Sequence, residues 1–472
     1  MDNFRPYDQS QGAFRAIIPN ELLEPEHPAR IVNKVVELLD LSSIYGWYQD
    51  EGAQPYHPKM MLKVLFYSYQ TGTMSSRGMW EGLKQRADYI FLSGDQIPDF
   101  RTLSNFRRRH LEQLPGVFAQ IVHLCVRLGM IDFKYLAIDG QKIQADASWR
   151  RSKTKKRLEK SMAKVTEGMR KLLEKDVSED FSEQTKQKRL GELARQEKQL
   201  LGLKQMLDLI EDEKANINMT DPEAKVMRHK DGRSLPSYNH QSAVDGAYGV
   251  SCAVKSEDRC DGELDLLELV DQARENTGEV HEKVMADSAF GGYEVLEKLE
   301  EAKRPEEFFV PDARFDASGK DEGESKGKFD GSRFEKREDG TVICPAGEPM
   351  VFKGERQEEG HTVRSYAGGA CEGCALRENC TTAKQRTLNT DSREPLREAM
   401  REKLRTDRGR EIYMKRQGIV EAVHGDDQRN KGWRQHLLRG KGKAALEFML
   451  MRIGSNLSKI ATHKPRELLA FG

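Results

Sequence analysis

The chain lacks any apolar run near the ~20 residues that a membrane-spanning helix needs. Its first residues, MDNFRPYDQSQGAF, also lack the basic and then apolar pattern of a secretion signal. Net charge is missing as well, because 77 Lys and Arg balance 77 Asp and Glu. A protein that coats nucleic acid through an overall basic surface is therefore disfavoured. These absences predict a cytoplasmic protein with no membrane partner.

Cysteine is scarce, and its count of seven is odd, which argues against a disulfide framework. What is present is typical of a globular chain, with 37% hydrophobic and 33% charged residues. A disordered chain would contain fewer Leu, Val and Phe. The length of 472 residues suffices for about two to four domains and at least one sizeable core.

The balanced charge is unevenly distributed along the chain. Residues 150–157 (RRSKTKKR) are mostly basic, and Arg is frequent in 384–416 and 429–443. Local basic segments of this kind leave DNA binding open even at zero net charge.

Residues 1–130 are predicted to form a helical DNA-binding domain. Apolar residues recur at helical spacing in 28–40, and further helices are expected from Pro58, from Ser75 and over 114–128. The segment RTLSNFRRRH (101–110) places four arginines beside Ser and Asn, which together can contact phosphates and base edges. These arginines are Arg101, Arg107, Arg108 and Arg109. The alternative is an ordinary amphipathic helix with a solvated basic face.

Beyond residue 130 the period changes to that of strands. A strand is expected at 133–138, ending on Asp139 and Gly140, followed by a hairpin over 238–255 that turns near Asp245. Shorter strands are expected at 283–286 and 307–310, with helices at 263–275 and 293–302 between them. The fold class is therefore α/β, multidomain, with foreign segments inserted into the core.

The insertions divide the chain into six parts. Residues 150–217 are highly charged and predicted to form a helical hairpin, which is either a DNA-contacting or a purely solvated arm. The proposed parts are 1–130 (helical domain), 131–149 (first part of the core), 150–217 (helical insert), 218–311 (second part of the core), 312–385 (loop and cysteine insert) and 386–472 (C-terminal helices, interrupted near 425–432).

Two aspartates follow predicted strands and are candidate metal ligands. Asp139 follows LAI and Asp287 follows VMA, and ligands of open α/β sheets gather at the carboxyl ends of strands. Two such carboxylates can share Mg²⁺ (or Mn²⁺), and a third would complete a two-metal site for phosphoryl transfer. Either Asp could instead be a turn former or a helix cap.

Glu421 is the candidate third acid, on a predicted helix that also carries Tyr413 and Arg416. An Arg near the acids can hold a phosphate bidentately, and Arg429 is a further candidate for DNA contact. The alternatives are Asp245 for the second ligand, and Asp426 or Asp427, expected in a loop, for the third.

Four cysteines cluster late in the chain, in two turns that carry Gly or Pro. They suit a structural Zn²⁺ site, because four thiolates leave no open coordination position. The alternative is a set of free cysteines in an insert, and Cys125, Cys252 and Cys260 are expected to be structural. The predicted zinc ligands are Cys344, Cys371, Cys374 and Cys380.

Several runs in a specific order resemble bacterial insertion-sequence DDE transposases, most nearly insertion sequence family 1182. The resemblance covers roughly residues 15–462. Two departures are His424-Gly425, where the family commonly has an aromatic residue before Gly, and Gln428, where it tends to have Lys. The runs that carry it are YHPKMMLKVLFYSYQTG, DFRTLSNFRRRH, IDGQKIQADAS, NMTDPEAKVMRHKDG, YNHQSAVD, VMADSAFGGYE and YMKR-x4-E.

The resemblance implies a ribonuclease-H-like core in which Asp139, Asp287 and Glu421 are the catalytic triad. It implies cleavage of the terminal inverted repeats of an insertion sequence, transfer of the 3′-hydroxyl ends to target DNA, and a homodimer acting near the nucleoid. Two alternatives stay open. One is a decayed or domesticated transposase that only binds DNA, and the other is a ribonuclease-H-like nuclease without strand transfer.

Overall fold

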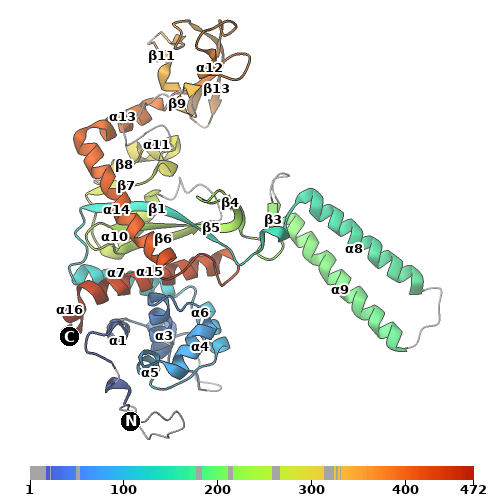
Figure 1. Cartoon of the computed structure of the whole chain (residues 1–472), viewed down its shortest axis with the longest axis vertical. Coiled ribbons are helices and arrows are strands. Elements are labelled where there is room, and N and C mark those ends of the chain that lie inside the picture. The colour runs from blue at the N-terminus through green and yellow to red at the C-terminus, as the bar shows by residue number, and fades with distance from the viewer. Residues whose placement is uncertain are drawn as a thin grey trace, which may run out of the picture. The chain divides into compact units, whose positions relative to one another are not determined.

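The computed structural model divides into two compact units, each described by itself (Figure 1). Unit 1 comprises Met1–Leu124 and Leu450–Gly472, and unit 2 comprises Cys125–Met449. The last residues thus join the N-terminal helices, whereas the sequence-based division grouped them with 386–472. The structure describes residues 18–21, 23–48, 54–176, 183–210, 216–257, 266–312, 324–325, 328–329, 331–337, 339–358 and 360–471, so Cys260 lies outside the described residues.

Unit 1 is helical, as its apolar periodicity predicts. Ser75 is the cap that the sequence predicts and accepts from the Gly78 N–H, and Asp99 is a further cap that accepts from the N–H groups of Arg101 and Thr102. The helices are α1 (Pro28–Leu38), α2 (Ser42–Tyr45), α3 (Pro58–Gln70), α4 (Ser76–Gln85), α5 (Ala87–Ser93), α6 (Phe100–Arg109), most of α7 (Leu114–Arg127), the end of α15 (Lys441–His463) and α16 (Pro465–Leu469).

Unit 2 is built on a six-stranded mixed sheet with the order β4-β5-β1-β7-β8, and β6 also pairs with β5. The β5–β1 and β5–β6 pairs are antiparallel, whereas β1–β7 and β7–β8 are parallel. The strands are β1 (Tyr135–Gln144), β4 (Lys225–Arg228), β5 (Ser234–Asp245), β6 (Ser251–Glu257), β7 (Lys283–Met285) and β8 (Glu307–Phe309). The predicted hairpin and both short strands are confirmed.

The first strand is longer than predicted. It continues past Asp139 to Gln144, because β5 pairs with it over its whole length, from Leu136↔Asp245 to Gln144↔Ser237. The parallel partner β7 pairs only as far as Ala137↔Met285. Asp139 therefore lies within β1, just past the point where its parallel neighbour ends, and the prediction that the strand ends there is wrong.

Unit 2 also contains the helices α10 (Leu266–Thr277), α11 (Tyr293–Ala302), α13 (Glu394–Arg405) and α14 (Asp407–Arg429). Ile412 and Val420 of α14 pack on Ala137, Met285 and Phe309 of the three parallel strands. The predicted break near 425–432 is wrong, because α14 continues through Gly425 to Arg429. The break lies at 430–440, before α15.

The charged insert forms two helices, α8 (Lys155–Asp176) and α9 (Glu183–Asp208), which run back along each other (Figure 1). A small core joins them: Leu158, Leu203 and Ile217 are buried, with Met162 and Val165 packed against them. Strands β2 (Ser152–Thr154) and β3 (Asn216–Asn218) close the base of the hairpin. The apolar stripes in this segment thus serve helix pairing.

The cysteine-bearing part has its own small core, around Phe334, Met350 and Tyr366. Its main sheet has the order β13-β14-β15. The elements here are β9 (Glu324–Ser325), β10 (Lys328–Phe329), β11 (Glu335–Lys336), β12 (Val342–Ile343), β13 (Met350–Glu358), β14 (His361–Gly368), α12 (Arg377–Cys380) and β15 (Thr387–Asp391). Among the helices described across the whole chain, none has the length and apolar character to cross a membrane.

Candidate active site

The register of two parallel strands brings Asp139 and Asp287 together. The pairing ends at Ala137↔Met285, and Asp139 and Asp287 each follow that pair by two residues, close enough for the charge of Asp139 to raise the pKa of Asp287. Side chains alternate across a sheet, and both carboxylates therefore lie on the same face as Ala137 and Met285. That is the face covered by α14. Two acids far apart in sequence thus meet beneath one helix.

Asp139 lies beside two basic side chains of α14, Arg416 and His424. Arg416 Nη1 lies 3.4 Å from its Oδ1, and His424 Nδ1 lies 3.4 Å from its Oδ2. Burial raises the pKa of this carboxyl, but the hydrogen bond and charge of His424, with the charge of Arg416, outweigh burial and lower the pKa overall. Asp139 is therefore an ionised carboxylate at neutral pH.

Asp287 has the opposite electrostatic character. Burial, and then the neighbouring charge of Asp139, raise its pKa, although Arg416 and Lys230 oppose them. Its side chain also accepts a hydrogen bond from the Ala289 N–H at 3.0 Å, capping a short 3-10 turn. The alternative interpretation of Asp287 as a helix cap is thus confirmed. The cap holds the Asp287 carboxylate near that of Asp139.

Tyr413 completes the cluster on the α14 side. Burial raises the pKa of its hydroxyl, Arg416 lowers it, and the charges of Asp287 and Asp139 raise it again, which places the phenol near both acids. The guanidinium of Arg416 stands 5.8 Å from its ring centre. Tyr413 and Arg416 thus line the carboxylates, three residues apart on one helix face.

Glu421 lies on the same helix but not in the cluster. Its side chain is exposed and its Oε1 accepts a hydrogen bond from Gln417 Nε2 at 3.0 Å. Within the described part of the chain, no three His, Cys, Asp or Glu side chains are grouped closely enough to hold a metal ion. The structure therefore brings two of the three predicted acids together. The third acid, Glu421, lies one helical turn before His424.

The rival acids have other partners. Asp245 is fully buried at the far end of β5, opposite Leu136, and its Oδ2 lies 3.3 Å from His281 Nε2. Asp426 and Asp427 belong to α14 rather than a loop, and Lys431 lies 3.1 Å from Asp426. None of the three joins Asp139 and Asp287 in the described structure.

The donor set of the paired aspartates fits a hard divalent cation. Two carboxylates lie near each other in a half-buried site, and the charge of Asp139 disfavours the charge of Asp287. Oxygen ligands of this kind suit Mg²⁺ or Mn²⁺, which would remove that repulsion.

The predicted DNA-contacting arginines of unit 1 fall into two groups. Arg101 and Arg108 line a shallow groove between α4 and α6, with Arg77 and Asn105 among its other lining residues. Arg107 is buried instead, and its guanidinium donates to the Tyr69 hydroxyl at 2.7 Å, which ties α6 to α3. The sequence pattern of three consecutive arginines could not distinguish these roles.

The two remaining predicted contacts are exposed basic residues. Arg109 stands over the Trp47 ring at 5.1 Å. Arg429 is exposed in the last turn of α14, about two turns beyond Glu421.

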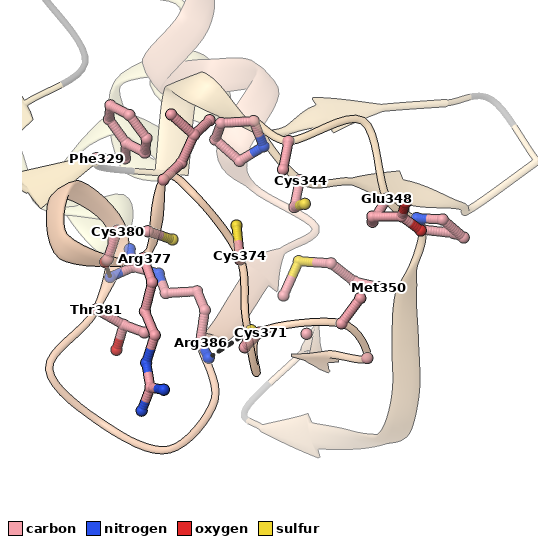
Figure 2. Close-up of a pocket in the computed structure, with 17 residues that line it drawn as sticks. Phe329, Cys344, Glu348, Met350, Cys371, Cys374, Arg377, Cys380, Thr381 and Arg386 are labelled. Atoms are coloured by element: carbon pink, nitrogen blue, oxygen red, sulfur yellow. Dashed lines mark hydrogen bonds between the residues drawn. The ribbon is translucent and has the colours of Figure 1, made fainter.

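The four late cysteines surround one small cavity of about 30 Å³ (Figure 2). Gly347 and Gly373, which follow Cys344 and Cys371, have φ values of +81° that allow tight turns there. The Arg386 N–H donates to Cys371 Sγ at 3.4 Å. Burial raises the pKa of Cys380, Arg386 lowers it, and the other three thiols raise it. The cysteines are therefore neighbours, although not grouped as a formed metal site.

His424, Ser242 and Lys230 are site residues that sequence reasoning missed. His424 was noted only as a departure from the family pattern. Its distance from Tyr413 is about three helical turns, so the spacing alone indicates a shared face. Ser242 pairs with Asp139 across β1 and β5, which no local pattern reveals.

Two transposase family models match the chain. One, described as a transposase domain (DUF772), matches residues 18–109, and one described as a transposase DDE domain matches residues 343–461. The second segment contains Glu421 but neither Asp139 nor Asp287. No curated protein and no solved structure matches the chain. The two matches support a DDE-type transposase, with DNA as its partner, without singling out insertion sequence family 1182.

The opposite pKa shifts of the two aspartates predict opposite effects of their amides on stability. Because the pKa of Asp287 is raised, the folding stability that this residue contributes is present at low pH and lost as pH rises through that pKa. Asp287→Asn should therefore melt above wild type at neutral pH, with the difference vanishing towards pH ~4, near the unfolded pKa of Asp. Melting temperatures in the presence of a chelator would measure this.

Asp139→Asn is the matched comparison. The pKa of the Asp139 carboxyl is lowered, so the stability that this carboxylate contributes is present above the unfolded pKa and lost as pH falls through the folded pKa. This variant should melt below wild type at neutral pH and converge with it in acid. Shifts of the same sign for both variants at neutral pH would contradict the assigned electrostatics.

Proposed function

We propose that this protein is a DNA transposase that cleaves the ends of an insertion sequence and joins the freed 3′-hydroxyl ends to target DNA. The observation that carries the proposal is the pairing of Asp139 and Asp287 beneath α14, the helix that bears Glu421. The two transposase family matches support it as well, and neither matched segment contains Asp139 or Asp287. A homodimer holding two DNA ends near the nucleoid belongs to this proposal.

A ribonuclease-H-like core is part of the proposal. The strand order β6-β5-β1-β7-β8, antiparallel from β6 to β1 and parallel from β1 to β8, supports it. This order puts β1 in the centre with its acid on the face that α14 covers. Positioning of the acids then depends on the most constrained strand of the sheet.

Asp139 and Asp287 would hold the divalent cation, Mg²⁺ or Mn²⁺. When bound, it would neutralise charge on the attacking and leaving oxygens of a phosphodiester. Asp139 is suited to this because its carboxylate is ionised at neutral pH. Asp287 gains most from a cation, since its own charge is disfavoured by burial and by Asp139.

The residues of α14 orient the DNA strand and the acids. Arg416 stands beside Asp139 and can turn its fork of N–H donors towards a phosphate. Tyr413 lies next to it with a hydroxyl that stays protonated at neutral pH, as a donor. Phosphoryl transfer needs positioning and charge neutralisation more than covalent help, and these groups supply both.

Glu421 reaches the site in this proposal only by a change of rotamer. Its exposed side chain is held by a single hydrogen bond from Gln417, which costs little to break. Glu421 would then complete the set of carboxylates that hold the cation, because its flexible side-chain torsions allow another rotamer.

The two other functions share the same site. A nuclease without strand transfer would cut but not join, and a decayed transposase would bind DNA and do neither. The two aspartates, one on β1 and one just beyond the parallel strand β7, favour an active enzyme over a decayed one, because a binding protein has no need for two neighbouring half-buried carboxylates.

We also propose that the four late cysteines hold a structural Zn²⁺. Their shared cavity, the two glycine turns and the N–H donor to Cys371 support this, since thiolates in tight turns are typical zinc ligands. Zinc would stabilise a part of the chain that has only a small core of its own.

The zinc proposal predicts the metal content of the purified protein. Wild type should contain about one zinc per chain, and Cys374→Ser should lose it and melt at a lower temperature. Cys125→Ala is the control and should keep the metal, because Cys125 is buried away in a helix. Elemental analysis decides, and zinc-free wild type purified without chelators would refute the site.

The catalytic proposal predicts the outcome of a cleavage assay on a labelled duplex that carries the element's own end. Asp139→Asn, Asp287→Asn and Glu421→Gln should each lower the rate at least about a thousandfold, near 4 kcal/mol, while DNA affinity changes little. Glu301→Gln, at an exposed position of α11, should cut like wild type. Binding by wild type without any cutting would favour the decayed protein, and cutting without joining would favour the nuclease.

The groove of unit 1 predicts which arginines bind DNA. Arg101→Ala and Arg108→Ala should each weaken binding and reduce the slope of log K against log salt by about one. Lys464→Ala, a surface cation of the same unit paired with Glu467, should leave the slope unchanged. Arg107→Ala should lower the melting temperature instead, because it removes the bond to Tyr69. Equal salt slopes for all four variants would refute the groove.

A further inference from the structure

We propose that the turn between β4 and β5, residues 229–233, binds the cut DNA strand at a phosphate next to the reacting one, through the ammonium group of Lys230. The inference rests on the proposed function and goes beyond it, because it gives that strand a contact outside α14 and outside unit 1. Neither family match covers the turn, since the matched segments are 18–109 and 343–461.

The end of β4 is tied to the strand that carries the first acid. Lys142, which follows Asp139 by three residues on β1, donates from Nζ to the Arg228 carbonyl at 3.4 Å. The charges around the second acid also include the turn. Burial and the charge of Asp139 raise the pKa of Asp287, and the charge of Lys230 is among those that lower it. The ammonium group of Lys230 therefore lies within electrostatic range of the acid pair.

Hydrogen bonds fix the conformation of the turn. The His229 N–H donates to the Arg233 carbonyl at 2.8 Å, and the Gly232 N–H donates to the His229 carbonyl at 3.0 Å. Gly232 has a φ of +84°, which glycine adopts without strain. The His229 ring lies 2.7 Å from the Ser237 hydroxyl, and burial lowers the pKa of this ring, which is therefore neutral at neutral pH. A turn fixed in this way loses little conformational entropy when it binds a ligand.

The acid of the turn is occupied by a residue other than Lys230. Asp231 pairs with Arg233, with 2.7 Å between Oδ2 and Nη2, and its Oδ1 accepts from the Arg233 N–H at 3.0 Å. The side chains of Arg228 and Lys230 are both exposed, and neither has an ion pair or a hydrogen bond among the residues that the structure describes. Their charge is therefore left for a partner that this part of the chain does not supply.

A DNA strand that crosses the acid pair is the partner that fits this charge. Its phosphates approach the ionised carboxylate of Asp139, and the repulsion between them opposes binding. A fixed cation beside the acids offsets that repulsion at the neighbouring phosphate. Lysine suits this position because its ammonium group is a compact point charge with three N–H donors for phosphate oxygens. The contact then helps to place the reacting phosphate over the aspartates.

Binding of the full chain to a labelled duplex that carries the element's own end, measured in a chelator, tests the charge. Lys230→Gln should weaken binding about five- to tenfold at ~0.1 M salt and reduce the slope of log K against log salt by about one, the contribution of one phosphate contact. Lys230→Arg keeps the charge and should restore both values. Lys225→Gln is the matched control, because it removes an equally exposed cation from the start of β4, and it should change neither value.

A neutral methylphosphonate, placed in turn at each phosphate on either side of the cleaved bond, locates the contact. At the contacted phosphate it should weaken binding by wild type about as much as Lys230→Gln does. It should weaken binding by Lys230→Gln no further there, because the interaction is already lost. At the same phosphate Lys225→Gln should lose as much affinity as wild type.

These results separate the contact from the proposed function. Additive losses at every phosphate beside the cleaved bond, or equal effects of Lys230→Gln and Lys225→Gln, overturn the contact and leave the transposase standing. Failure of wild type to bind the duplex overturns both. Non-additive losses at a phosphate beside the bond, in a protein that does not cut once Mg²⁺ is supplied, support the contact and overturn the proposed cleavage.

Discussion

The parallel pairing of β1 with β7 is the constraint on which the site depends. It places Asp139 beside Asp287, at a separation that neither residue could enforce alone, and turns both towards α14. The surrounding residues shift the pKa values of the two aspartates in opposite directions. His424 and Arg416 keep Asp139 ionised, while burial and that same ionised neighbour raise the pKa of Asp287. Such unequal acids are typical of functional sites, where stability is given up for charge that a ligand later neutralises.

Helix α14 must stay in register with the sheet for this arrangement to hold, and the segment after it provides the anchor. His436 lies between two partners, with Nε2 2.8 Å from His240 of β5 and Nδ1 3.0 Å from Glu447 of α15. Trp433 is buried nearby and donates its backbone N–H to the Asp427 carbonyl. A satisfied buried network of this kind favours one arrangement of its elements. The end of α14 is thus fixed to the strand that pairs with β1.

The sequence predicted most elements and part of the site. Apolar periodicity and capping residues predicted the helices of unit 1 and the charged hairpin, and alternation predicted the β5–β6 hairpin. Three features escaped. β1 runs past Asp139 because a partner a hundred residues away pairs with it, and α14 runs through Gly425 because its buried face continues to Asp427. His424 could be placed only once the helix was known to lie over Asp139. Each failure concerns a tertiary partner that local patterns do not contain.

The central claim is that Asp139 binds the cation that cleavage requires, and replacement by a softer ligand tests it most directly. Asp139→Cys should be inactive on the element's end in Mg²⁺ and recover cleavage in Mn²⁺, because thiolates bind Mg²⁺ poorly and transition metals better. Asp139→Ala should recover in neither. Two results would contradict the account. One is cleavage by Asp139→Cys at the wild-type rate in Mg²⁺. The other is that neither Asp139→Cys nor Asp287→Cys recovers cleavage in Mn²⁺.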